Sequence, residues 1–157
     1  MHHNDHAAAL GRVPSGLFIL TVGRESHATG MLASWVQQCS FEPPQLTVAV
    51  QRGRPVHDML HDRAPFVINI LGEGQPDLLK HFSKGFEPGK PAFEGLEISH
   101  TSAGVPILLA ALSHLACEVA GRHAVGDHDL IVGRIVGGAS HREGRPAVHI
   151  RKSGTHY

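Results

Sequence analysis

The sequence lacks the long hydrophobic runs and the charge excess that mark several protein classes. No segment reaches about 18 consecutive apolar residues, and the polar residues 1–6 are not followed by the hydrophobic core of a signal peptide. Lys plus Arg and Asp plus Glu number 14 each, so no charge imbalance points to nucleic acid or to a membrane surface. We therefore expect a cytoplasmic protein that binds neither.

Cysteine is also scarce. Cys39 and Cys117 are the only two, and they match no zinc or CxxC spacing. Without an export signal we expect both thiols to be reduced. The 14 histidines are scattered without an HExxH pattern, so as a set they indicate a solvated surface more than a metal site. We expect no bound metal.

What is present suits a single domain. A chain of 157 residues with 41% hydrophobic residues is long enough to bury an ordinary globular core. The sequence shows no internal repeat and no boundary between domains. We expect one domain over residues 1–157, with residues 1–6 as a disordered arm.

Short strands dominate the expected elements. Leu46, Val48 and Val50 alternate with wetter residues, which is typical of a half-buried strand. Pro43 and Pro44 force a turn before it, and Pro55 stands where a helix tolerates proline. Strands are expected over 17–22, 29–39, 46–50, 66–71, 113–121, 130–139 and 147–151, and helices over 7–13, 56–62 and 75–82. Strands without βαβ alternation predict a mostly β barrel or sandwich.

Residues 83–95 and 122–129 are expected as connections. The first contains five Gly or Pro residues and reads as a long irregular loop, which in a compact domain is usually functional or mobile. The second separates the strands expected over 113–121 and 130–139.

The stretch from Met31 to Pro55 carries a family resemblance. Its letters MLASWVQQCSFEPPQLTVAVQRGRP resemble the signature of the flavin reductase-like, FMN-binding split-barrel family. Within that family it is most similar to the reductase module at the C-terminus of flavodiiron proteins. Four later blocks keep the family's order: FVINILGEGQPDLLKHFSKG, KPAFEGLEIS, GDHDLIVGRIVGG and AVHIRKSGTHY. Together the blocks cover the chain from about Gly11 onward.

The resemblance implies a split β-barrel with a few short helices, assembled as a homodimer. It implies FMN as the flavin and NADH or NADPH as the hydride donor. An electron-accepting protein, such as a monooxygenase or a flavodiiron-type partner, would take the electrons onward.

The resemblance also implies that one strand holds the flavin ring. Small and amide side chains let a flat ligand lie against the backbone and form hydrogen bonds with it. The implied ring-binding residues are Met31, Ala33, Ser34, Trp35, Gln38, Cys39 and Ser40. The alternative is an ordinary half-buried strand, and Trp35 suits a core or interface position as well as a stacking one.

Arg52, Gly53 and Arg54 are the implied phosphate-binding loop. Two guanidinium groups and free N–H groups at the start of a helix are suited to a phosphate dianion. A solvated basic turn is the alternative, and the family's frequent Ser or Thr in this loop leaves the individual contacts open.

Four further residues complete the implied site. Asn69 stands among apolar neighbours in FVINIL, so it must bond either the backbone, which we slightly favour, or the ligand. Phe82 and Lys84 lie beside the flavin or simply form a packed helix end. His128 in the GDH motif lies near the flavin and the nicotinamide, or is an exposed turn residue.

These residues lead us to predict an NAD(P)H-dependent flavin reductase with His128 as its catalytic candidate. The rival is a non-enzymatic FMN module that carries electrons between proteins. A haem-binding split barrel is the weaker third reading, because no histidine is a preferred axial ligand.

Overall fold

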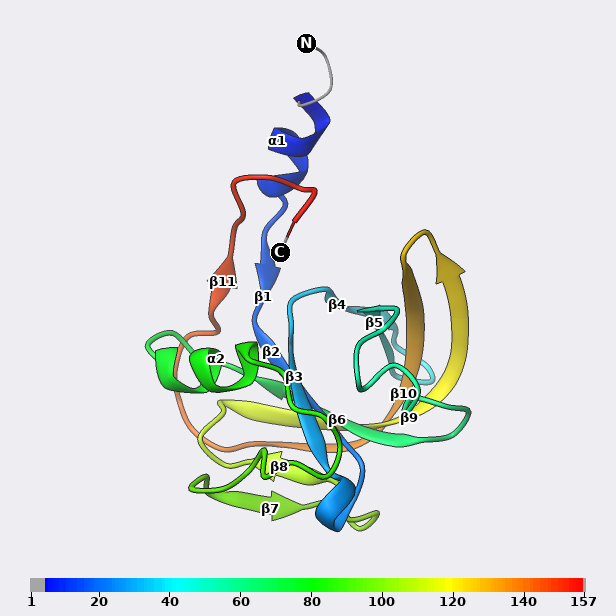
Figure 1. Ribbon diagram of the computed structural model, residues 1–157, viewed down its shortest axis with the longest axis vertical. Helices are drawn as coiled ribbons and strands as arrows, with labels where there is room; N and C mark the ends of the chain where they lie inside the picture. Colours follow the sequence, from blue (N-terminus) through cyan, green and yellow to red (C-terminus); the bar gives the residue numbers. More distant parts are fainter. Residues whose placement is uncertain (1–4, 157) are drawn as a thin grey trace.

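The computed structural model describes residues 5–156, and Figure 1 shows a β-barrel with a narrow arm projecting from it. The helices of these residues are α1 (Asp5–Gly11), the 3-10 helix η1 (Glu25–His27) and α2 (Pro76–Ser83). The strands of the same residues are β1 (Ser15–Gly16), β2 (Phe18–Val22), β3 (Thr29–Ala33), β4 (Val36–Ser40), β5 (Gln45–Gln51), β6 (Pro65–Ile70), β7 (Ile98–His100), β8 (Pro106–Leu108), β9 (Ser113–Val125), β10 (His128–Ser140) and β11 (Val148–His149). The prediction of a mostly β barrel is confirmed.

The barrel is one antiparallel sheet in the order β3-β2-β6-β9-β10-β5-β4. The sequence predicted a single strand over 29–39, and this was wrong: Ser34 and Trp35 separate β3 from β4. These two strands lie at opposite edges of the sheet, although only two residues join them. Three Cα–Cα steps span about 11 Å at most, so the sheet must curl until its edges come close at this point.

The predicted alternation places β5 correctly. Leu46, Val48 and Val50 are buried in the barrel core, where Phe66 and Ile68 of β6 join them. The intervening residues of β5 are only partly buried and form its other face. A second apolar cluster lies under α2, whose Leu78 and Phe82 are buried as the predicted helical spacing requires.

The hairpin of β9 and β10 is longer than predicted. Residues 122–129 were expected as a connection, but β9 continues to Val125 and β10 begins at His128. Pairing continues to the tip, where His128 faces Val125 and only Gly126 and Asp127 turn the chain. Arg122 and His123 are exposed on this ribbon.

The helix expected over 56–62 is absent, and residues 52–62 form successive turns, which we call the clamp loop. Its bonds span three residues, as from His57 N to Arg54 O and from Met59 N to Val56 O. Arg122 donates to the carbonyl oxygens of His57 and Leu60 and so connects these turns to β9. The strands β7 and β8 were not expected, and they form a separate short pair.

The arm combines both ends of the described chain. β1 pairs with β11, and the backbone of α1 bonds the last residues through Gly11 O to Arg151 N and Ala7 O to Gly154 N. Most of the disordered arm expected over residues 1–6 lies outside the described residues, but Asp5 and His6 belong to α1 and correct that expectation. The arm exposes Leu10, Val13, Val148 and Ile150.

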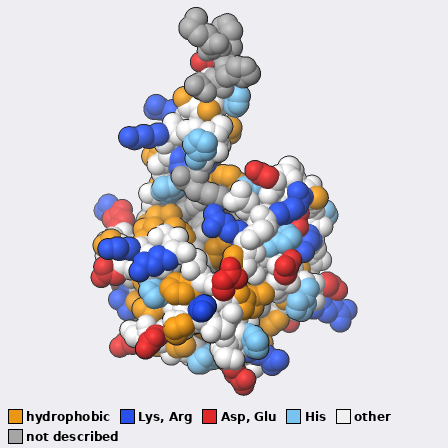
Figure 2. Space-filling model, in the orientation of Figure 1, with side chains coloured by type: hydrophobic (Ala, Val, Ile, Leu, Met, Phe, Trp, Pro, Cys, Tyr) orange, Lys and Arg blue, Asp and Glu red, His pale blue; other side chains and the backbone are white. Residues whose placement is uncertain are grey.

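The surface agrees with the balanced composition. On the face seen in Figure 2, Lys and Arg side chains are interspersed with Asp and Glu. Cys39 is exposed and Cys117 is buried, and both are free thiols. Burial raises the pKa of Cys117 to about 12. No helix among the described residues is long and apolar enough to cross a membrane.

Candidate functional site

A cavity of about 290 Å³ lies where β3, the end of β5 and the last turn of α2 meet. Apolar side chains form most of its lining: Leu17, Met31, Leu32, Trp35, Leu79 and Phe82. Ala33, Ala49 and Gly85 add small residues, and Ser34, Gln51, Arg54, Ser83 and His149 add polar ones. None of these lining residues is acidic. A mostly apolar hollow with a few polar groups is typical of small-molecule sites.

Six of the predicted site residues meet at this cavity: Met31, Ala33, Ser34, Trp35, Arg54 and Phe82. The break between β3 and β4 explains why Gln38, Cys39 and Ser40 do not line it. Beyond Trp35 the chain runs along β4 toward the exposed turn at Phe41, so these three residues leave the cavity. Their contact with the flavin ring stays a prediction.

The three residues of the predicted phosphate loop do not lie together. Arg54 lines the cavity, whereas Arg52 turns toward the β9–β10 hairpin and Gly53 has open space around it. The side chain of Arg52 donates to Asp129 Oδ1 and to the carbonyl oxygens of Gly126 and His128. Because the helix at residue 56 is absent, the predicted binding to a helix N-terminus is withdrawn.

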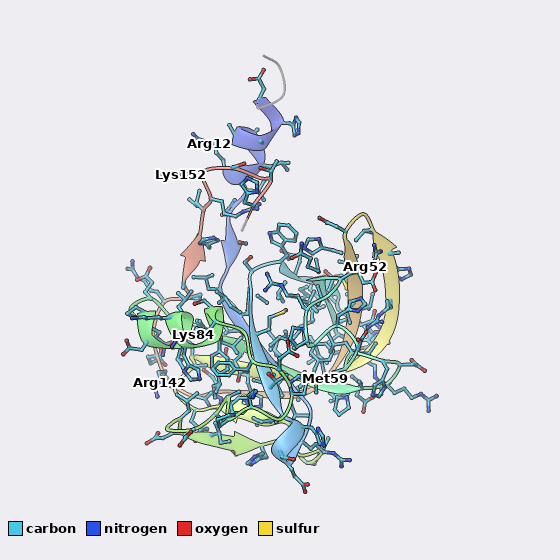
Figure 3. The ribbon with its side chains drawn as sticks, in the orientation of Figure 1. Arg12, Arg52, Met59, Lys84, Arg142 and Lys152 are labelled. Carbon is cyan, nitrogen blue, oxygen red and sulfur yellow. The ribbon has the colours of Figure 1, made fainter. Side chains whose placement is uncertain are left out.

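Asn69 and Lys84 do not line this cavity either. Asn69 is 0% exposed, and its amide donates to Ile19 O and accepts from Leu108 N, each at 2.9 Å. The backbone role favoured for it is therefore the one that the structure shows. Lys84 follows α2 as an exposed residue outside the lining, and Figure 3 shows it and Arg52 on opposite sides of the central strands.

Trp35 lies between two basic side chains at the wall of the cavity. The His128 ring is 4.9 Å from the Trp35 ring, and the Arg151 guanidinium carbon is 5.2 Å from the Trp35 centroid. His128 is buried at the start of β10, so the exposed turn position considered for it is wrong. Its Nδ1 lies 2.6 Å from Asp127 Oδ1, and this hydrogen bond lowers the pKa of Asp127.

A buried carboxylate lies behind the clamp loop. Asp129 is 6% exposed, and its Oδ2 lies 2.7 Å from His57 Nε2, while its Oδ1 lies 3.0 Å from Arg52 Nη2. Arg122 Nε is 3.7 Å from Oδ2. The hydrogen bond with His57, followed by the one with Arg52, lowers the pKa of Asp129 and keeps it ionised. We call these four residues the Asp129 cluster.

Several lining residues were missed by sequence reasoning. Ala49 and Gln51 carried a usable signal, because the core positions of β5 put the alternate residues on the opposite face. His149 carried none, since its place depends on the pairing of β11 with β1, far away in the sequence. A second hollow of about 460 Å³ shares Ser34, Trp35 and Ala49 with the first.

Residues 5–156 contain no group of three or more His, Cys, Asp or Glu side chains placed to hold a metal ion.

Comparisons with known proteins agree on one family. The sequence model described as "Flavin reductase like domain" matches residues 10–155. Diflavin flavoprotein A 1 of Synechocystis sp. is 42% identical over 156 residues, which are 98% of this chain and 27% of that protein. The chain thus spans about a quarter of that relative.

Two solved structures share the fold. The styrene monooxygenase flavin reductase of Pseudomonas putida S12 is 26% identical, with a TM-score of 0.76 over 91% of this chain and 90% of its own. An NADH:FAD oxidoreductase of Streptomyces globisporus, solved with NAD and FAD fragments, is 23% identical. Its TM-score is 0.82 over 91% of this chain and 85% of its own.

Proposed function

Because this chain belongs to the flavin reductase like domain family, we propose that it binds FMN in the cavity and reduces it with NADH or NADPH. The family makes the chain a flavoprotein and an oxidoreductase acting on flavin. The cavity supports the finer assignment. It has an apolar wall, a cation at Arg54 and no acidic lining residue, as a flat ring with a phosphate tail requires.

The residues that line the cavity have different roles in the proposed binding of FMN. Leu17, Leu32 and Phe82 offer apolar surface to the ring and exclude water, while Ser34 and Gln51 offer hydrogen bonds. Arg54 takes the phosphate, to which a charged hydrogen bond contributes about 1.5–3 kcal/mol. When bound, FMN supplies the hydride-accepting chemistry, and the protein supplies orientation and electrostatics.

His128 remains the candidate residue for the reaction itself. It is buried against Trp35 rather than in the cavity lining. We assign it to seating the nicotinamide carboxamide or to donating a hydrogen bond to charge that develops during hydride transfer. Its bond to Asp127 fixes the orientation of the ring beside Trp35.

We also propose that the protein is a cytoplasmic single domain that works as a homodimer. The apolar side chains Leu10, Val13, Val148 and Ile150 are exposed on the arm, where a second copy would cover them. The electron acceptor is proposed to be a protein, such as a monooxygenase or a flavodiiron-type partner. Light scattering of the FMN-loaded protein should give the mass of two chains, and a monomer mass at micromolar concentration contradicts the dimer.

An anaerobic absorption experiment tests the function. The purified protein is titrated with FMN, FAD, riboflavin and haem, and the flavin-loaded protein is then mixed with NADH or NADPH. Flavin binding followed by bleaching of the flavin band supports the reductase. Flavin binding without reduction by either nucleotide would make the chain an electron-transfer module, and haem binding without flavin binding at micromolar concentration would reject both.

A further inference from the structure

The Asp129 cluster joins two segments that are distant in the sequence. Arg52 and His57 belong to the clamp loop, whereas Arg122 lies on β9 and Asp129 on β10. Each of the three basic side chains reaches the same buried carboxylate, with the shortest distance at His57 Nε2. The loop and the hairpin are therefore connected through one anionic centre.

The same cations also bind the backbone of the opposite segment. Arg52 crosses from the loop to Gly126 O and His128 O at the hairpin tip. Arg122 crosses from the hairpin to His57 O and Leu60 O, each at 2.7 Å. The clamp loop is thus fixed to the hairpin at both of its ends by side chains instead of regular secondary structure.

The Asp129 cluster lies beside the two residues to which we assign the flavin phosphate and the nicotinamide. Arg54 follows Arg52 by two residues and lines the cavity, while His128 immediately precedes Asp129 and lies against Trp35. Asp129 is outside the lining and has no direct access to the ligand there. Removal of its charge would leave Arg52, Arg122 and His57 without their common acceptor, and two of these are permanently cationic.

We propose that Asp129 is a positioning residue that places Arg54 for the flavin phosphate by fixing the clamp loop to the β9–β10 hairpin. This inference rests on the proposed flavin site. It makes a distinctive prediction, because a residue that acts through Arg54 affects only ligands that carry the phosphate. Loss of Asp129 should weaken FMN binding while riboflavin binding stays nearly unchanged.

The test is a double-mutant cycle between Asp129→Asn and Arg54→Ala, read as the ratio of FMN to riboflavin affinity. Asp129→Asn keeps the shape of the side chain and loses its charge. It should lower the ratio by about tenfold in the native background and by less than about twofold in the Arg54→Ala background. The matched control is Asp58→Asn, since Asp58 also contacts His57 but its side chain is 98% exposed, and the ratio should stay within about twofold.

Other outcomes have distinct meanings. Equal weakening of both flavins by Asp129→Asn, or a full effect that persists without Arg54, would reduce Asp129 to a residue of general stability. If native protein binds no flavin, the proposed function itself fails. If Asp129→Asn does not fold, Arg52→Lys carries the test, because one ammonium cannot replace three guanidinium contacts. That variant should also lower the ratio by about tenfold, and an unchanged ratio overturns the inference.

Discussion

The two walls of the cavity are built in different ways. The apolar wall is formed by Leu17 just before β2, Leu32 on β3, and Leu79 and Phe82 on α2. Its packing is close: a Cβ on Gly30 of β3 would lie 2.6 Å from Phe82 Cε1, so a glycine allows the helix to approach the strand. The cationic wall is Arg54 on the clamp loop, which depends on the Asp129 cluster.

The difference between the two walls predicts which wall sets the affinity for all flavins and which wall sets the selectivity for flavins with a phosphate. Apolar burial acts on every flavin, because all flavins share the ring. A charged hydrogen bond to phosphate acts only on those that carry one. The following variants, ordered by the size of the expected effect, separate the two contributions.

Filling the cavity should have the largest effect on flavin affinity. Ala49 faces the cavity from β5, and Ala49→Phe would place a ring where the flavin lies. We expect FMN and riboflavin affinity to fall by about a hundredfold or more, and equally. Isothermal titration with both flavins measures this.

Thr47→Phe is the matched control for Ala49→Phe. Thr47 lies two residues earlier on β5 and borders the second hollow but not the first. Its replacement should change flavin affinity by less than about threefold. If Thr47→Phe were as damaging as Ala49→Phe, the flavin would extend into the second hollow.

Removing the cationic wall should have a smaller and selective effect. Arg54→Ala should weaken FMN by about ten- to a hundredfold and riboflavin by much less, because one charged hydrogen-bonding group is lost. Arg134→Ala, at an exposed ion pair with Glu118, is the control and should change neither affinity. An equal loss for both flavins would remove Arg54 from the phosphate site.

His128→Ala tests the reaction instead of the binding. We expect FMN affinity to stay within a few-fold and the rate of flavin reduction by NADH or NADPH to fall by about tenfold. Anaerobic stopped-flow absorbance at saturating nucleotide measures the rate, with His123→Ala on the exposed face of β9 as the control. A native rate would leave His128 with a packing role beside Trp35.

The smallest expected effect lies away from the cavity. His114 stacks on His141 with 5.0 Å between ring centroids, and burial, with the neighbouring His141, lowers the pKa of His114. The unfolded chain then binds the proton more readily, so stability should fall as pH drops below about 6.5. His114→Gln should flatten this fall in Tm relative to the exposed control His100→Gln. An unchanged pH slope would show that His114 does not contribute to it.

The sequence was most informative where local pattern decides structure. The alternation in β5 and the helical spacing of Leu78 and Phe82 were read correctly because each side chain meets the core at its own periodic position. The expectation that Asn69 bonds the backbone followed from the cost of burying an unpaired amide.

Long-range pairing decided the remainder. The break at Ser34 and Trp35 comes from closure of the sheet, which no local pattern records. The turns of the clamp loop are bound by Arg122, more than 60 positions away from both carbonyls, which donates to the oxygens of His57 and Leu60. Arg52 points away from the cavity that Arg54 lines, and its side chain donates to Asp129, which is also far away in the sequence.

A crystal structure of the protein grown with FMN would locate the flavin directly. We expect the ring between β3 and Phe82, and the phosphate within hydrogen-bonding distance of the Arg54 guanidinium. Arg52 should keep its contact with Asp129 in that complex. A ring in the second hollow, or a phosphate bound by Lys84 while Arg54 points away, would contradict this expectation.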